Sequence, residues 1–179
     1  MPDYRRLYQN GGTYFFTVVT YGRNPVFRSE AAIALLKGCL EHVALAHPLV
    51  IEALVILPDH LHTIWTLPEK ECDFSTRWSL IKGKFSHQCQ MQPQILSTSR
   101  QNKRERAVWQ RRFWEHLVHD QNDFNRLCDY IHYNPVKHGL ARSPEEWPHS
   151  TFREFIARGL YPENWSSIVT KEIKEMSLE

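Results

Sequence analysis

The chain has 179 residues, of which 42% are hydrophobic and 12% are aromatic, and its formal net charge is +2. This length suits one folded domain with a proper core, and this composition excludes an intrinsically disordered chain. No apolar run is long enough to span a membrane, and neither a signal peptide nor a disulfide framework is evident, so we expect a cytoplasmic protein.

The hydrophobic pattern predicts alternating strands and helices along the chain. β-branched and aromatic residues predict strands over residues 13–21, 49–57 and 60–67, and a short strand over residues 115–119. Apolar residues at helical spacing predict helices over residues 29–46, with Ser29 as N-cap, and over residues 75–89. The order strand, helix, strand, strand, helix, strand is that of a ferredoxin-like α+β sandwich.

Two histidines flank one apolar residue in the third expected strand, as His60, Leu61 and His62. Alternate side chains of a strand point to the same face, so both imidazoles leave the sheet together while Leu61 packs on the other face. That geometry can chelate one metal ion. A chance pair is the competing interpretation, because the chain contains 10 histidines.

A further helix is expected from about Asp123, and it should end near Asn134 because the residue before Pro135 is pushed out of the α region. Tyr130 and Asn134 then lie one turn apart on one helical face. The amide can complete a His, His, Asn ligand set while a partly exposed tyrosine hydroxyl faces the substrate. The competing interpretation is an amphipathic helix with a half-buried tyrosine and a capping asparagine. Tyr133 is the rival nucleophile, but it points about 100° away from Asn134.

Together these segments resemble the single-tyrosine HUH transposases, and among them the REP-associated tyrosine transposases of bacteria. The name HUH describes His60-Leu61-His62. Asn134 stands where larger insertion-sequence relatives commonly carry a glutamine, which is a longer amide with the same ligand oxygen. Matching blocks span roughly residues 4 to 152, in this order: Tyr4-Arg5-Arg6, Gly12 to Val18, Leu57 to His62, Trp109-Gln110, Phe113 to His116, Tyr130 to Gly139 and Trp147 to Phe152.

The resemblance implies a ferredoxin-like or RRM-like α+β sandwich whose central antiparallel sheet carries the HUH motif, with helices on one face. It implies a catalytic domain over residues 1–152 and a C-terminal extension over residues 153–179. The extension is apolar enough to pack on the catalytic domain. From Arg153 it has five acids against four bases, so it should not strengthen DNA binding. If it lies near the DNA groove, it would compete with substrate.

The function implied by the resemblance is metal-dependent cleavage and rejoining of single-stranded DNA at REP-type palindromic hairpins. Tyr130 would attack phosphorus and form a 5′-phosphotyrosine intermediate. His60, His62 and Asn134 would hold Mg²⁺ or Mn²⁺, and Mn²⁺ suits this mixed nitrogen and oxygen set better. We expect a nucleoid-associated enzyme that acts as a monomer on one hairpin.

Hairpin binding would fall to basic residues, although their ranking stays open. Six bases lie between Arg100 and Arg112 against one acid, whereas the chain after Glu145 is acidic. A solvated loop is the competing interpretation of this basic run. Two other functions stay open, a non-catalytic single-stranded nucleic-acid-binding module and a metal-dependent hydrolase of small molecules. The candidate DNA-binding residues are Arg5, Arg6, Lys82, Lys84, Arg104, Arg111 and Arg112.

Overall fold

The computed structural model describes residues 6–89, 108–162, 164–165 and 169–178. These residues form an antiparallel sheet of four strands in the order β2-β3-β1-β4, which confirms the expected α+β architecture. Every expected strand is present, with bounds within a few residues of the prediction. The strands are β1 (Thr13–Val19), β2 (Val50–Ile56), β3 (His60–Thr66) and β4 (Trp114–Leu117).

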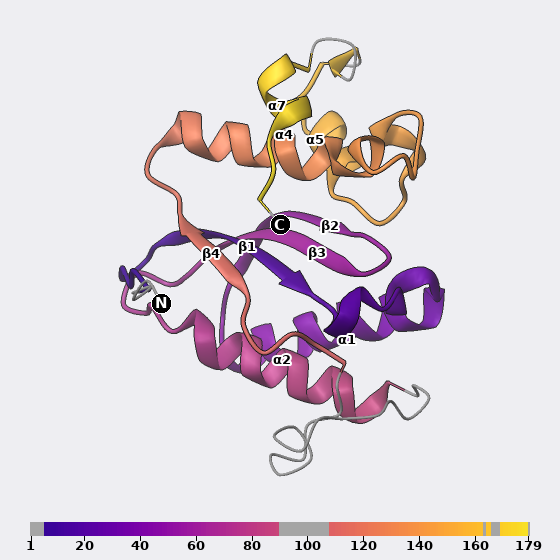
Figure 1. The fold of residues 1–179 in the computed structure, drawn as a ribbon. Coiled ribbons are helices and arrows are strands. Elements are labelled where there is room, and N and C mark those ends of the chain that lie inside the picture. The colour runs from indigo at the N-terminus through magenta and orange to yellow at the C-terminus, as the bar shows by residue number, and fades with distance from the viewer. Residues whose placement is uncertain (1–5, 90–107, 163, 166–168, 179) are drawn as a thin grey trace, which may run out of the picture.

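Helices cover both faces of this sheet, so the expectation of helices on one face was wrong (Figure 1). The reason is that β1 and β3 carry apolar side chains on both sides. Leu61 and Trp65 point toward one helical layer, whereas Phe15 and Ile64 point toward the other. The first layer is α1 (Glu30–Ala46) and α2 (Phe74–Gln88), and the second is α4 (Gln121–Lys137), α5 (Phe152–Ala157) and α7 (Lys171–Glu175).

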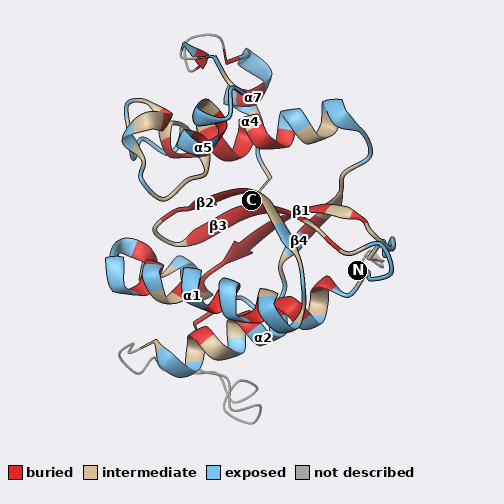
Figure 2. Cartoon of the chain, turned by 180° about the vertical axis from the view of Figure 1, so that it is seen from behind, coloured by how far each residue is buried: buried red, intermediate tan, exposed pale blue. Residues whose placement is uncertain are grey.

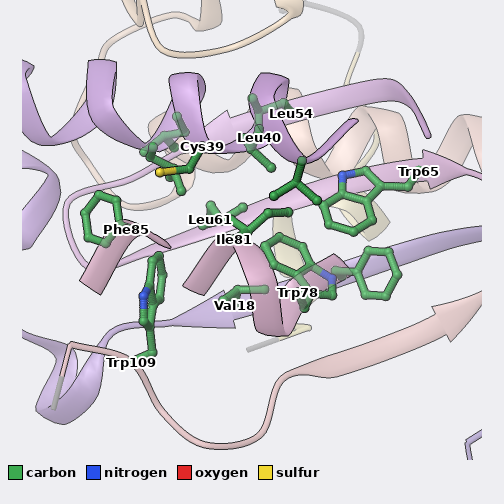
Figure 3. Packing of buried hydrophobic residues seen from close by; sticks show 14 of the residues in the cluster. Val18, Cys39, Leu40, Leu54, Leu61, Trp65, Trp78, Ile81, Phe85 and Trp109 are labelled. Atoms are coloured by element: carbon green, nitrogen blue, oxygen red, sulfur yellow. The ribbon is translucent and has the colours of Figure 1, made fainter. Parts of the chain in front are cut away.

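The larger core lies between the sheet and the layer of α1 and α2. Trp65 and Trp78 stack at its centre, with ring centroids 4.2 Å apart and planes 18° apart (Figure 3). Ser29 caps α1 as expected, because its hydroxyl accepts a hydrogen bond from the Ala32 amide. Figure 2 shows that buried residues line the facing sides of both helical layers and the sheet. Among the described helices, none has the length and apolarity that a bilayer crossing needs.

The helix α4 continues past Asn134 to Lys137, so the predicted end was wrong. The helix ends at Lys137 because Gly139 adopts a left-handed backbone conformation with φ of 65°. The Gly139 amide bonds to the Val136 carbonyl at 3.0 Å, and the Leu140 amide bonds to the Pro135 carbonyl at 2.9 Å. This pair of bonds is a Schellman motif, which satisfies the last carbonyls of the helix. Tyr130 and Asn134 therefore share one continuous helix.

The chain after α4 wraps over the outer side of this helix and reaches one edge of the sheet. The Thr151 amide bonds to the Leu54 carbonyl at 2.9 Å, which covers the outer edge of β2. A cluster of Phe152, Trp165, Val169 and Ile173 packs beyond α4. From α7 the C-terminal segment descends between α4 and the sheet (Figure 1). This path brings the end of the chain to the face that carries the histidine pair.

Candidate active site

The two histidines of β3 lie buried on the side of the sheet that α4 covers. His60 and His62 are 2% and 0% exposed, and their ring centroids are 4.9 Å apart. Leu61 between them packs into the core on the opposite side. The alternation of the strand thus places both imidazoles together, at a separation that suits one shared ion.

Hydrogen bonds at Nδ1 orient both rings. His60 Nδ1 lies 2.6 Å from the Asp59 carboxylate, and Arg23 bonds to the same carboxylate at 3.2 Å. Burial raises the pKa of Asp59, but the hydrogen bonds from His60 and Arg23 and the charge of Arg23 outweigh burial and hold that pKa below its usual value. Asp59 is therefore an acceptor, so we infer that His60 carries its proton on Nδ1 and directs Nε2 toward the site.

His62 is held in the same tautomer by Thr17. The Thr17 hydroxyl donates to the Leu178 carbonyl at 2.6 Å, so its oxygen accepts the Nδ1 proton of His62 at 2.9 Å. Burial, with smaller contributions from neighbouring cations such as Lys137, holds the pKa of His62 well below its usual value. A neutral imidazole with a bare Nε2 is the form that binds a metal.

Tyr130 projects from α4 toward His62, and Asn134 follows Tyr130 by one helical turn on the same face of α4. The Tyr130 ring lies 5.1 Å from the His62 ring and 6.0 Å from the Phe15 ring. Asn134 is fully buried, and within the described residues neither atom of its amide group has a hydrogen-bond partner. The same holds for His62 Nε2. Buried polar atoms without partners cost roughly 1–3 kcal/mol each, so their presence on two elements in contact, α4 and β3, indicates a site built for a ligand.

The tyrosine hydroxyl is not exposed as expected, because the C-terminal segment covers it. Tyr130 is 1% exposed, and its oxygen accepts a hydrogen bond from the Leu178 amide at 3.2 Å. Lys137 donates to the Met176 carbonyl, and its ammonium also lies 5.3 Å over the Tyr130 ring. The last described residues therefore occupy the space where a substrate would meet the hydroxyl.

The rival tyrosine lies elsewhere. Tyr133 is half-buried and packs against the cluster of Phe152 and Trp165, beyond α4 from the sheet. The ammonium of Lys174 lies 6.0 Å over its ring. Because Tyr133 faces away from the histidine pair, the geometry favours Tyr130 as the candidate nucleophile.

Comparison with known proteins identifies the family. Residues 9–134 match the family described as "Transposase IS200 like". The REP-associated tyrosine transposase of Escherichia coli (strain K12) is 41% identical over 170 residues, which covers 95% of this chain and 94% of that protein. The chain belongs to the REP-associated tyrosine transposases. A solved structure of such a transposase bound to a REP hairpin has a TM-score of 0.79 and 38% identity over 100% of both chains. The chain is thus a DNA-acting transesterase of the IS200-like family.

In this REP-associated transposase, two of the predicted DNA-binding residues, Arg6 and Lys82, lie on the opposite side of the sheet from Tyr130. Arg6 and Lys82 meet at Phe113, which packs on the side of α1 and α2. Arg6 pairs with buried Glu115 at 3.3 Å, and Lys82 donates to the Gln110 carbonyl at 3.0 Å. Burial, followed by the charge of Arg6, lowers the pKa of Lys82 to about 8. Both cations therefore hold the segment before β4 in place.

The other predicted DNA-binding residues that the structure describes lie on α2 and just before β4. Lys84 lies on α2, partly exposed, and Arg111 and Arg112 are exposed just before β4. Arg5 and Arg104 lie outside the described residues. The assignment of these residues to DNA stays a prediction.

Three residues of the transposase site were missed from sequence. Asp59 adjoins the histidine pair, and that adjacency was a usable signal. Lys137 follows Tyr130 by seven positions, two helical turns, which places both on one face. Thr17 offered no signal, because its contact with His62 depends on the pairing of β1 with β3.

Proposed function

We propose that this transposase cleaves and rejoins single-stranded DNA at REP-type palindromic hairpins, with Tyr130 as the nucleophile. The observation that carries the proposal is the approach of Tyr130 to the histidine pair, with its ring 5.1 Å from His62. The E. coli relative and the hairpin-bound structure support DNA hairpins as the substrate class. A phenol beside a buried ligand set is the arrangement that phosphodiester transesterification needs.

We further propose that His60, His62 and Asn134 hold a divalent ion, Mg²⁺ or Mn²⁺. The fit rests on the bare Nε2 of His62 and the unpartnered Asn134 amide among the described residues, together with the His60 ring 4.9 Å from His62. Two imidazole nitrogens and one amide oxygen suit Mn²⁺ better than Mg²⁺. When bound, the ion supplies Lewis-acid polarisation and orientation of the scissile phosphate.

Tyr130 and Lys137 would then have separate roles in the reaction. The Tyr130 oxygen attacks phosphorus, the bond from phosphorus to the 3′-oxygen breaks, and the DNA strand stays attached through a 5′-phosphotyrosine. Lys137, close above the Tyr130 ring, is placed to neutralise charge on the phosphate. One phosphodiester replaces another, so a 3′-hydroxyl can reverse the step and rejoin strands without ATP.

We propose that residues 1–152 form the catalytic domain and that residues 153–179 are an extension packed on it. The support is the contact of Phe155, Tyr161 and Met176 with the cluster that contains Tyr130. We also propose a monomer that acts on one hairpin in the cytoplasm, at the nucleoid.

The test is a covalent adduct between the protein and a labelled REP-type hairpin with a single-stranded 5′ extension. With Mn²⁺, the natural chain should form a labelled band that survives SDS, and Tyr130→Phe should lose both this band and cleavage. Tyr133→Phe is the matched control and should retain both, because its hydroxyl faces away from the histidines. An adduct that persists in Tyr130→Phe would refute the assignment. Binding without any adduct in the natural chain would favour a non-catalytic binding module.

A further inference from the structure

Among the residues that the structure describes, one tryptophan on the α4 side of the sheet remains exposed. Trp114 is the first residue of β4, the strand at one edge of the sheet, and it is 37% exposed. Trp65, Trp78, Trp109 and Trp165 are all buried. Because exposed indole rings lose the stabilisation that burial gives, an exposed tryptophan beside an active site points to a ligand that covers it.

The register of the sheet relates Trp114 to the proposed metal ligands. Trp114 pairs with Thr17 across β4 and β1, and Thr17 pairs with His62 across β1 and β3. Paired residues point to the same face, so the three side chains form a row on the α4 side. Neighbouring strands lie about 4.8 Å apart, which places Trp114 roughly 10 Å from His62. A base close to the scissile phosphate can reach this position.

Aromatic rings connect the tryptophan to the nucleophile. The Phe15 ring lies 5.6 Å from the Trp114 ring, 5.6 Å from the His62 ring and 6.0 Å from the Tyr130 ring. On its other side, the Trp114 ring is parallel to the His116 ring, with planes 9° apart and centroids 6.0 Å apart. A row of ring contacts, buried except at Trp114, therefore connects the site to the edge of the sheet.

Positive charge lies close to the exposed ring in sequence. Arg111 and Arg112 precede Trp114 by three and two positions, and both are exposed. Exposed arginines within three positions of an exposed indole suit single-stranded nucleic acid, which presents both phosphates and the π-faces of its bases.

We infer that Trp114 is a stacking platform for a base of single-stranded DNA next to the scissile phosphate, with Arg111 and Arg112 contacting phosphates of the same strand. The inference rests on the proposed function, because it takes the strand at Tyr130 to be the one that reaches Trp114. Stacking a base beside the site fixes the register of the strand, so Trp114 helps to choose which phosphate meets the tyrosine.

The test measures binding without cleavage. Full-length Tyr130→Phe is mixed with REP-type hairpins whose single-stranded 5′ extension carries 2-aminopurine at successive positions. One position should lose fluorescence on binding, because 2-aminopurine is quenched when it stacks. Adding Trp114→Ala should abolish that quenching and weaken binding roughly 10-fold, whereas Trp114→Phe should preserve most of both. Leu80→Ala is the control, since Leu80 is 41% exposed on α2, on the opposite side of the sheet, and should change neither.

The outcomes separate this inference from the proposed function. Unchanged quenching and affinity in Trp114→Ala would overturn the platform, even if the natural chain still forms its adduct at Tyr130. Equal losses in Trp114→Phe and Trp114→Ala, with native circular dichroism, would also overturn it, because a phenyl ring retains a stacking face. A hairpin without the extension should bind Trp114→Ala normally, and weakened binding there would place the residue on duplex DNA instead. Absence of any adduct in the natural chain would refute the proposed function. The quenching experiment would still decide whether a base stacks on Trp114, because it measures binding and not cleavage.

Discussion

The C-terminal segment over Tyr130 predicts that this transposase restrains its own activity. Leu178 donates its amide proton to the Tyr130 oxygen and accepts the Thr17 proton, and Lys137 bonds to the Met176 carbonyl. A strand of DNA that presents its phosphate to Tyr130 must displace these residues. We therefore expect removal of residues 176–179 to increase the rate of cleavage.

The size of the increase follows from the contacts that are lost. The two neutral hydrogen bonds contribute about 1 kcal/mol each and the bond from Lys137 about 2 kcal/mol. Partial burial of Met176 and Leu178 adds about 2 kcal/mol in total. Ordering three residues costs about 4 kcal/mol, so the closed segment is favoured by about 2 kcal/mol. The site would then be open in only a few per cent of molecules, and truncation should raise cleavage at limiting DNA roughly 30-fold.

The assay compares initial rates of hairpin cleavage by the natural chain and by the chain ending at Glu175. A longer deletion after Gly159 would be a poorer test, because Tyr161, Trp165 and Ile173 pack beyond α4 and their loss would loosen this helix. Leu178→Pro removes the amide donor together with the packed leucine side chain and should give part of the increase, while Ser177→Ala, at an exposed position, should give none. Light scattering should show a monomer in each case. A truncated chain that stays folded and cuts no faster would refute this reasoning.

Three further predictions concern the metal, the end of α4 and the response to acid. EDTA should stop cleavage and added Mn²⁺ or Mg²⁺ should restore it, whereas His62→Ala should stay inactive in excess metal; full activity in EDTA would remove the role proposed for the histidines. In urea titrations, Gly139→Ala should lower the free energy of unfolding by about 1 kcal/mol, because Gly139 has φ of 65°. Gly38→Ala is the control: Gly38 lies inside α1 with open space around it, so this change should raise the free energy of unfolding by about 0.5–1 kcal/mol. Burial lowers the pKa of His132 to about 3, below its value near 6.5 in an unfolded chain, so the unfolded state binds the extra proton between these values. The contribution of His132 to the free energy of unfolding should therefore be fully present above about pH 6.5 and fall by up to about 1.4 kcal/mol per pH unit toward pH 3. Asp129 should offset part of this loss, because burial raises its pKa. Urea midpoints that stay constant from pH 6.5 to 4 would contradict this.

Local periodicity in the sequence determined which side chains share a face. The alternation of a strand put His60 and His62 on one side of the sheet, and the helical repeat put Tyr130 one turn from Asn134. Ser29 as N-cap was also predictable, because capping involves only residues three positions apart. The family was predictable for the same reason, since its motifs are short and local.

Only the tertiary structure decided what those faces meet. Thr17 reaches His62 through strand pairing across 45 positions, and Leu178 reaches Tyr130 across 48 positions. The charge pattern could not show that Arg6 pairs with Glu115 on the far side of the sheet from the nucleophile. Nor could it show that helices would cover both faces. Periodicity fixes directions along one element, whereas partners between elements depend on how all the apolar faces of the chain are buried together.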